Sequence, residues 1–379
     1  MDIGRSTPLL GGLSAREFMR RHWQKKPLLI RAAMPDAQLL VDRATLFALA
    51  ANDAVESRLV RRNDDQWSLR PGPFARRALP PLKASGWTLL VQGADLHLEA
   101  AHRLLGRFRF VPDARLDDVM FSFATDGGGV GPHIDSYDVF LLQVSGRRRW
   151  RIGRPREARL RADVPLKMLA GFVASDEWLL EPGDMLYLPP GWGHDGVAEG
   201  ETITASIGFR SAGRETLAVE VLQQILDAVQ ADEDEPRYAD ADQDATDQPA
   251  RIPAALQRYA DKAVKRLVDD RDARACALGQ ALSEPKPGVW FERGTTDAPT
   301  DARVRLDRRT RMLYDDRHVF INGEACRIRG SDAKMIRRLA DARRLETAEL
   351  ASLGADAKAA IERWHAAGWL HLDTLGDPP

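Results

Sequence analysis

Cysteine is scarce in this chain, and the two cysteines that it has lie far apart. Of the 379 residues only Cys276 and Cys326 are cysteines, and their separation fits no metal-binding spacing. This excludes a disulfide scaffold and a zinc site built from thiolates as organising features. We expect both to be free thiols in a reducing cytoplasm.

Long apolar runs and a dominant charge are lacking as well. No apolar segment approaches the roughly 20 residues of a membrane-spanning helix, and the N-terminal MDIGRSTPLL lacks the apolar core of a signal peptide. The 55 basic and 56 acidic residues leave a formal net charge of −1. Such a balance gives no overall attraction to nucleic acids or anionic membranes, so we expect a cytoplasmic protein that binds neither.

The length of the chain allows two or three domains, and the first ninety or so residues mix helix and strand. Ser14 and Glu17 form a capping-box pattern ahead of a predicted helix over residues 15–26. A second helix is predicted over 42–52. Three further segments have the pattern of strands or connectors, namely 56–62, 66–74 and 86–95.

The central block, from about Leu116 to about Ser211, is predicted to be all-β. Short apolar stretches alternate there with Gly, Pro and Asp at the spacing of a sandwich or barrel. The predicted strands are 117–125, 137–146, 147–153, 184–191 and 202–210.

A helical region is expected to follow the β block. Residues 215–230 have an apolar stripe at helical spacing, and 252–282 form a further predicted helix. The acidic stretch 231–250 between them is predicted to be a surface loop. The stripe consists of Leu217, Val221, Ile225 and Val229.

The last hundred residues have the pattern of a small α/β unit. Asn322-Gly323 is a hairpin-turn dipeptide, helices are predicted over 331–345 and 348–368, and GWLHLDT closes the chain with a strand. Helices with a short hairpin resemble a winged helix. The expected parts are therefore 1–95, an α/β part supporting the barrel; 96–212, the β block; 213–282, a helical module; and 283–379, a winged-helix-like domain.

The segment GGGVGPHIDSYDVF carries a candidate metal motif. His133 and Asp135 are two residues apart, so on an extended strand their side chains point to the same face. His194 follows a later predicted strand within LPPGWGHDG. Two imidazoles and one carboxylate, with open positions, are the ligand set of non-haem Fe(II) oxygenases.

An isolated His-x-Asp pair is usually incidental, so the surroundings of this pair decide the interpretation. It follows a glycine-rich turn, opens a strand and lies in the only β block, which offers no histidine beyond His133 and His194. This counts against metal cupins that use additional histidine ligands. The remaining histidines, expected on surfaces or helices, are His22, His97, His102, His318, His365 and His371.

The run GRRRW supplies a candidate anion-binding cation. A guanidinium can meet a carboxylate with two parallel charge-assisted bonds. If a turn at Ser145-Gly146 opens a strand, alternation separates Arg148 from Arg147 and Arg149. Arg148 would share its face with Trp150 and Ile152 and point inward, although three solvated arginines on an edge would give the same sequence.

Four segments together resemble the JmjC-domain ribosomal oxygenases of the bacterial arginyl-hydroxylase kind. They are FMRRHWQKKPLLI, residues 127–153, residues 181–196 and SIGFR at 206–210. The resemblance implies an α+β fold with a double-stranded β-helix (the cupin-type jelly roll) at its core. It also implies that the helices after the barrel form a dimerisation module and that the C-terminal unit is winged-helix-like.

The resemblance also implies the cofactors and their residues. Fe(II) would be held by His133, Asp135 and His194. 2-Oxoglutarate would pair its distal carboxylate with Arg148, with Ser122 as a hydrogen-bonding partner, and O₂ would be the oxidant.

The implied reaction is hydroxylation of an arginine side chain of a large-subunit ribosomal protein, the sixteenth in the usual naming. Tyr137 shares parity with His133 and Asp135, so it is a candidate substrate contact, or alternatively a residue packed in the barrel. Two other functions stay open: a ribosomal protein histidine hydroxylase, as among the animal relatives, and a non-catalytic winged-helix binding protein.

Overall fold

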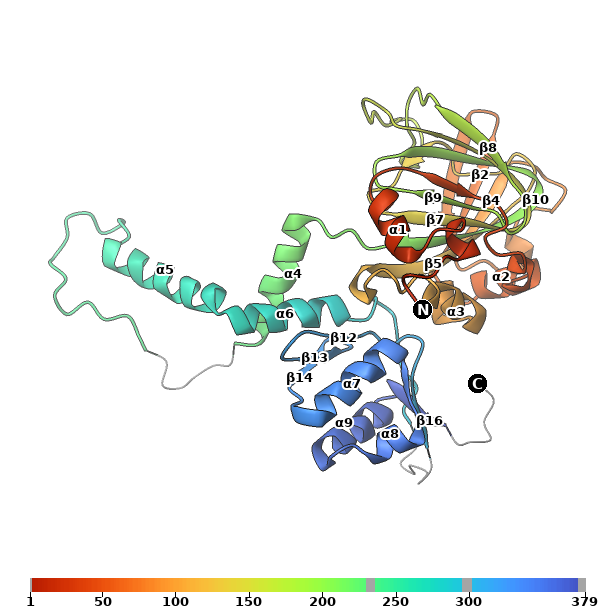
Figure 1. Cartoon of the computed structure of the whole chain (residues 1–379). Coiled ribbons are helices and arrows are strands. Elements are labelled where there is room, and N and C mark those ends of the chain that lie inside the picture. Colours follow the sequence, from red (N-terminus) through yellow and green to blue (C-terminus); the bar gives the residue numbers. More distant parts are fainter. Residues whose placement is uncertain (1, 230–235, 295–301, 374–379) are drawn as a thin grey trace. The chain divides into compact units, whose positions relative to one another are not determined.

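The computed structural model describes residues 2–229, 236–294 and 302–373. The chain divides into two compact units, Met1–Ser211 and Ala212–Pro379. Both units are shown in Figure 1. The four-part division expected from the sequence is finer than these units and stays a prediction.

The first unit is built on one large, bent antiparallel sheet. Within the described residues its strands pair in the order β1-β9-β7-β10-β5-β4-β2-β3, with β6 on β10 and β8 on β7. The strands are β1 (Leu28–Ile30), β2 (Ser57–Asn63), β3 (Gln66–Pro71), β4 (Trp87–Val91), β5 (Leu116–Ala124), β6 (His133–Ile134), β7 (Val139–Gly153), β8 (Asp176–Leu180), β9 (Met185–Leu188) and β10 (Gly193–Phe209).

The two longest strands, β7 and β10, bend the sheet into a sandwich. The first half of β7 pairs with β9 and the second half with β8, and the β10 register shifts between Glu199 and Ile203. A turn at Ser145-Gly146 was therefore the wrong prediction, because the chain runs through it as one strand. Gly146 has φ +65°, and a Cβ there would collide with the carbonyl oxygen of Glu201, so glycine allows the bend.

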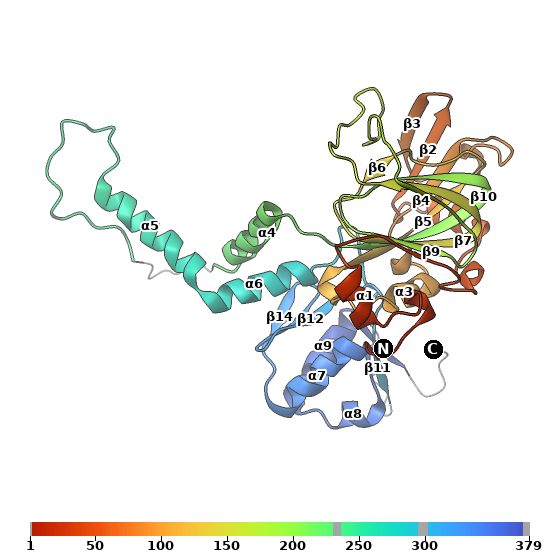
Figure 2. The ribbon, with the colours of Figure 1, turned by 45° about the horizontal axis from the view of Figure 1, so that its top comes forward.

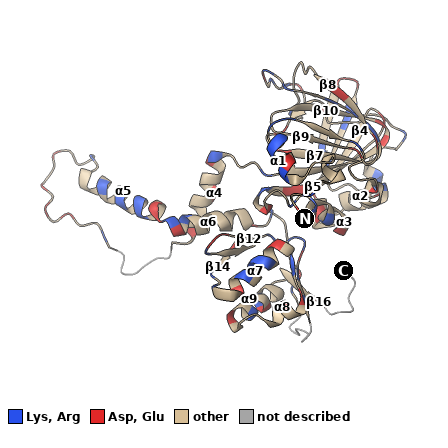
Figure 3. Cartoon of the chain, in the orientation of Figure 1, with Lys and Arg blue, Asp and Glu red and all other residues tan. Residues whose placement is uncertain are grey.

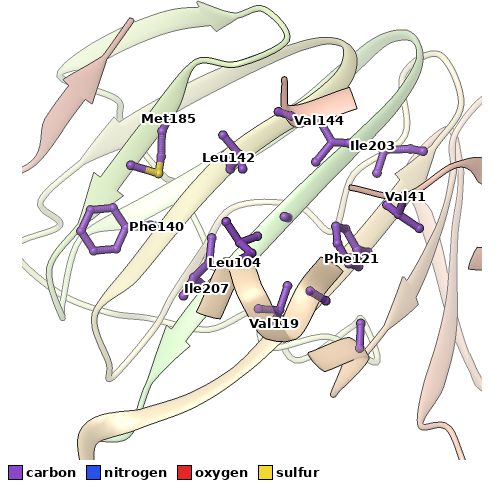
Figure 4. Packing of buried hydrophobic residues seen from close by; sticks show 14 of the residues in the cluster. Val41, Leu104, Val119, Phe121, Phe140, Leu142, Val144, Met185, Ile203 and Ile207 are labelled. Atoms are coloured by element: carbon purple, nitrogen blue, oxygen red, sulfur yellow. The ribbon is translucent and has the colours of Figure 1, made fainter. Parts of the chain in front are cut away.

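Side-chain alternation along β7 separates two cores. Phe140, Leu142 and Val144 pack in the larger core, towards the helices. Val139 and Leu141 point the other way and pack with side chains of the opposite layer inside the sandwich. Figure 4 shows residues of the larger core from β5, β7, β9, β10 and α3 in contact with one another.

Three helices cover the outer face of the sheet: α1 (Ala15–Arg21), α2 (Arg43–Ala50) and α3 (Glu99–Gly106). The predicted capping box is confirmed, since the Ser14 hydroxyl accepts from the Glu17 amide at 3.2 Å while Glu17 accepts from the Ser14 amide at 2.9 Å. β1 to β4 belong to the same sheet as the central block. The β structure is thus wider than the sequence indicated.

The second unit begins with three helices, α4 (Arg214–Asp227), α5 (Ala254–Asp269) and α6 (Arg271–Ser283). The helix expected over 252–282 is two helices, because Asp270 has an extended backbone and its carboxylate caps the amides of Asp272 and Ala273. Of the predicted acidic loop, residues 231–235 lie outside the described residues. Residues 236–250 form neither helix nor strand.

The winged-helix part closes the second unit (Figure 2). The predicted turn at Asn322-Gly323 is confirmed, and these two residues have φ of +48° and +88°. The core of the winged-helix part includes the buried Trp364. Its strands are β11 (Arg303–Leu306), β12 (Met312–Tyr314), β13 (Val319–Ile321), β14 (Glu324–Cys326), β15 (Arg344–Leu345) and β16 (Leu370–Asp373), and its helices are α7 (Gly330–Ala342), α8 (Thr347–Ala351) and α9 (Ala355–Ala366). Within the described ranges, no helix is long and apolar enough to cross a membrane.

Candidate metal and cosubstrate site

Strand register brings the two motif histidines together. In the β6–β10 ladder His194 lies directly opposite His133. β6 contains only His133 and Ile134, and Asp135 follows at its end. His194 is the second residue of β10 rather than part of the preceding turn, so its direction is fixed by the ladder.

The three side chains converge on one point. His133 Nε2 is 3.9 Å from Asp135 Oδ1, and His194 Nε2 is 3.6 Å from Asp135 Oδ2. One ligand atom from each residue lies within 4.8 Å of the others, and no other such group occurs among the residues that the structure describes. An ion bound between them would have open positions on its other side.

Backbone carbonyls select which imidazole nitrogen faces the centre. His133 Nδ1 lies 2.9 Å from the Gly131 carbonyl, and His194 Nδ1 lies 3.2 Å from the Trp192 carbonyl. Since a carbonyl oxygen only accepts, each Nδ1 is the donor to its carbonyl, and each Nε2 is the nitrogen that faces Asp135. This orientation directs both Nε2 atoms to the place where a metal ion would bind.

Burial shapes the electrostatics of the group. It lowers the pKa of His194 well below the usual value, and neighbouring His133 lowers it further, so His194 is neutral, the form that binds metal. Burial also raises the pKa of Asp135, which His133 and a hydrogen bond from Tyr137 oppose. A bound cation would therefore offset the free-energy cost of burying the Asp135 carboxylate.

The connection between β7 and β8 contacts both segments that carry the metal-motif residues. The Leu169 amide donates to the Pro132 carbonyl at 2.7 Å, next to His133. Phe172 packs so closely on Gly193 that a Cβ there would lie 2.7 Å from its ring. A larger residue at 193 would therefore displace the start of β10, where His194 lies.

Arg148 is buried inside the sandwich, as alternation predicted, and is 4% exposed. Its Nη1 donates to Ser122 Oγ at 3.0 Å, whereas Arg147 and Arg149 pair with Glu199 on the outer face. Ser122 faces inward because Phe121 and Phe123 point into the helix-covered core. Burial lowers the pKa of Arg148 to about 10, with Asp195 opposing the shift, so it is charged at neutral pH.

Arg148 has spare hydrogen-bonding capacity. Its Nε and Nη2 are buried and find no acceptor among the described residues. Buried donors are nearly always satisfied in folded proteins, so these two point to an anionic group that binds there. The three converging ligands and this cation fit a divalent metal with a dicarboxylate cosubstrate.

Tyr137 lies beside Asp135 and is partly exposed rather than packed in the barrel core. It lies in the bend between β6 and β7, not on a strand, and is 39% exposed, which excludes the packed-core alternative. Its hydroxyl bonds to Asp135, and partial burial, then Asp135 and Asp118, raise its pKa above the usual value. An acidic environment thus surrounds the position expected for a substrate contact.

Asp118 escaped the sequence analysis, whereas Asp138, which alternates with Tyr137, has a structural role. Asp118 shares the inward parity of Ser122 on β5 and also accepts from the Gly93 amide at 3.1 Å; that parity is the signal that could have found it. Asp138 is fully buried and accepts from the Tyr187 hydroxyl at 2.6 Å. It connects β9 to the start of β7. The carboxylate of the candidate metal group is that of Asp135 and not that of Asp138.

Comparison with known families agrees with this architecture. Residues 103–217 match the JmjC domain, and residues 266–371 match the ROXA-like winged helix. The ribosomal protein uL16 3-hydroxylase of Escherichia coli is 40% identical over 196 residues, which are 52% of each chain. The chain therefore spans about half the length of this relative in the alignment. A probable ribosomal oxygenase of Haemophilus influenzae is 29% identical over 89% of this chain and 88% of its own.

Solved structures extend the likeness over the whole fold. An X-ray structure of E. coli YcfD has a TM-score of 0.83, is 27% identical and covers 95% of this chain and 98% of that one. A structure of the ribosomal oxygenase YcfD in complex with cobalt and 2-oxoglutarate has a TM-score of 0.77 at the same identity and coverage.

A JmjC sandwich with a His-Asp-His group, followed by a ROXA-like winged helix, defines the class. The chain belongs to the JmjC-domain ribosomal oxygenases and is related to the E. coli uL16 3-hydroxylase. The predicted α+β fold with a jelly-roll core and a winged-helix C-terminal part is confirmed.

Proposed function

We propose that this chain is an Fe(II)- and 2-oxoglutarate-dependent protein hydroxylase acting on an arginine side chain of ribosomal protein uL16. The observation that carries the proposal is the convergence of His133, Asp135 and His194 within 4.8 Å of one another, in a sandwich that also buries Arg148. The E. coli relative is named a ribosomal protein uL16 3-hydroxylase, which supports uL16 as the substrate. Because that substrate is a ribosomal protein, we place the enzyme in the cytoplasm.

His133, Asp135 and His194 would hold the iron through two imidazole Nε2 atoms and one carboxylate. Bound iron with 2-oxoglutarate and O₂ supplies the oxidising power that places a hydroxyl group on an unactivated C–H bond, with succinate and CO₂ as co-products. The task of the chain is to position the reactants and to exclude water.

Arg148 and Ser122 would bind the distal carboxylate of 2-oxoglutarate. Two free guanidinium N–H groups match the two oxygens of a carboxylate. Because the arginine is 4% exposed, the ion pair forms away from solvent, where charge-assisted bonds are stronger. The 3.0 Å bond from Nη1 to Ser122 fixes the orientation of the guanidinium beforehand.

The acidic side chains around Tyr137 favour a cationic substrate. Tyr137 offers an aromatic face for a guanidinium, and Asp135, Asp118 and Asp117 act electrostatically on its hydroxyl. A neutral imidazole would gain less from this field than an arginine side chain. These groups support arginine over histidine as the target.

A turnover assay tests the proposal. The protein is incubated with Fe(II), 2-oxoglutarate and uL16 peptides, succinate is measured, and mass spectrometry locates an added oxygen atom on arginine. The control peptide replaces that arginine by lysine, and a histidine-bearing ribosomal peptide is assayed in parallel. Succinate formed only with the histidine peptide would support the histidine hydroxylase instead.

A non-catalytic winged-helix protein is the other function that the sequence left open. Basic and acidic side chains are interspersed along the helices of the winged-helix part (Figure 3), which does not favour a nucleic-acid surface. Nucleic-acid binding without succinate formation from any peptide would support this alternative.

We also propose that the helical module, α4 to α6, makes the protein a homodimer. α5 buries no residue, and α4 exposes Val219, Leu222 and Leu226, which are 66%, 44% and 57% exposed. Contiguous exposed apolar side chains of this size mark protein interaction sites. α4 packs on α6, and Ile225 is its buried residue, whereas these three apolar residues stay exposed.

A further inference from the structure

Trp150 lies between the two halves of the candidate site. Its ring centroid is 5.9 Å from that of the metal-motif residue His194, with the planes at 44°. On its other side, Cζ of Arg148 is 5.8 Å from the ring centroid. A molecule that reaches from the ion to the arginine must therefore pass along this indole.

The indole N–H of Trp150 is buried without an acceptor. Trp150 is 5% exposed, and its Nε1 has no hydrogen-bond partner within the part of the chain that the structure describes. Together with Nε and Nη2 of Arg148, three buried N–H groups lack acceptors in one region. Leaving such groups unsatisfied is costly, so the region is suited to a ligand rich in acceptor oxygens.

The position of the ring is fixed by the strand opposite. Gly196 of β10 pairs with Trp150 of β7, and a Cβ on Gly196 would lie 2.7 Å from the indole atoms Cη2 and Cζ3. A side chain at this position would push the ring away, so glycine lets the indole lie on the strand that carries His194.

We propose that Trp150 is a specificity-determining residue of the cosubstrate site. Its indole N–H donates a hydrogen bond to an oxygen of the bound 2-oxo dicarboxylate, and its ring fixes the separation between Arg148 and His194. The fixed separation selects a five-carbon diacid over its homologue with one more methylene. This inference rests on the proposed function, because it needs 2-oxoglutarate to bind at Arg148 and the ion.

Binding can be measured without turnover. Isothermal titration with Zn(II) in place of iron gives the dissociation constants of 2-oxoglutarate and of 2-oxoadipate. Trp150→Phe, which keeps an aromatic ring but loses the N–H, should weaken 2-oxoglutarate binding by roughly ten- to hundred-fold and reduce the preference over 2-oxoadipate. Zn(II) affinity, from competition with a chelator, should not change.

Trp178→Phe is the matched control. Trp178 lies on β8 directly across from Trp150 and packs against the same inner core. Removing its indole alters the same layer without removing the unpartnered N–H, so the 2-oxoglutarate affinity should stay at the wild-type value. An equal loss in both variants would overturn the specific role of Trp150.

The wild-type protein offers a direct readout as well. The chain has nine tryptophans, and ¹⁵N-indole spectra with Zn(II) should show one resonance moving downfield when 2-oxoglutarate is added. That resonance should be the one missing from the Trp150→Phe spectrum. If Trp150→Phe does not fold, the wild-type spectrum decides, and a titration in which no indole moves downfield overturns the inference.

The outcomes separate this inference from the proposed function. If the wild-type protein with Zn(II) binds no 2-oxoglutarate, both are overturned. If it binds, and Trp150→Phe binds with equal affinity and equal preference, only the role of Trp150 is overturned.

Discussion

At the scale of single residues, two backbone carbonyls prepare the histidines for a metal ion. Gly131 and Trp192 each accept from an Nδ1, so His133 and His194 both present Nε2 to Asp135. Neither carbonyl is visible in the sequence as a functional group. The glycine-rich approach to His133 is thus part of the candidate site, because it places the carbonyl that orients the ring.

Loss of the Asp135 carboxylate should strongly weaken metal binding. We expect Asp135→Ala to weaken Mn(II) or Zn(II) binding by more than the about 10–100-fold that follows loss of a residue that only orients a ligand, and to abolish turnover. Ser136→Ala, at the exposed neighbouring position, is the control. Chelator competition measures the affinity, and a variant that still binds the ion like wild type would remove Asp135 from the ligand set.

Loss of the buried arginine should affect the cosubstrate and spare the ion. Arg148→Ala removes the charged donors for the distal carboxylate. We therefore expect the binding free energy of 2-oxoglutarate to weaken by about 2–4 kcal/mol. Metal affinity should be unchanged. Arg147→Ala, on the outer face, controls for the loss of positive charge. Unchanged 2-oxoglutarate affinity in Arg148→Ala would exclude the assigned role.

At the scale of elements, the sequence predicted most strands but not how they face one another. The His-x-Asp motif and the parity of Arg148 depend only on neighbouring residues of one strand, so the sequence was sufficient to predict them. Ser122 entered only through family resemblance, and Asp118 was missed, because both depend on β5 lying opposite the Arg148 layer. The bend at Gly146 was predicted to be a turn because a glycine at a bulge and a glycine at a turn have the same local signature.

An acid-sensitive contact joins two elements of the winged-helix part. Asp307, after β11, accepts from His371 of β16 at 2.9 Å and from the Arg309 amide at 2.8 Å. Burial alone would raise the pKa of Asp307, but the bonds from His371 and Arg309 outweigh it and hold the pKa below the usual value. The ionised carboxylate therefore stabilises this part above the ordinary aspartate pKa, and the contribution is lost as pH falls through the lowered value.

Asp307→Asn should make this stabilisation measurable. At about pH 6 the variant should lose about 1–3 kcal/mol of protection in hydrogen exchange of peptides covering β11 and β16. Peptides from β5 and β7 in the first unit are the internal control. Well below the ordinary aspartate pKa of about 3.9, wild type and variant should converge. A difference that persists there would mean that charge is not the cause.

At the scale of the whole molecule, the two units differ in how well they bury their apolar residues. The sandwich has a continuous core under its helices. The helical module instead leaves apolar side chains of α4 and α5 exposed. Exposure of this kind is unusual in a monomer, and the sequence predicted the helices but could not show which faces stay uncovered.

Charges placed on this surface should separate the proposed dimer. We expect the wild-type chain to sediment as a dimer and Val219→Glu with Leu222→Glu to sediment as a monomer. The 2-oxoglutarate and metal affinities of that variant should be retained, since the first unit forms its own compact unit. Glu220→Lys, an exposed charge between these positions, is the control. A wild-type monomer in analytical ultracentrifugation contradicts the proposal.

The antiparallel pairing of β7 with β10 has a consequence for how such a protein could evolve. Ile152, Trp150 and Arg148 lie opposite His194, Gly196 and Ala198 in an unbroken register. Each step between alternate residues is about 6.6 Å, and a shift by one residue would turn every side chain to the other face. Selection for a longer or shorter diacid can therefore act only by exchanging side chains on this fixed scale, never by sliding the strands.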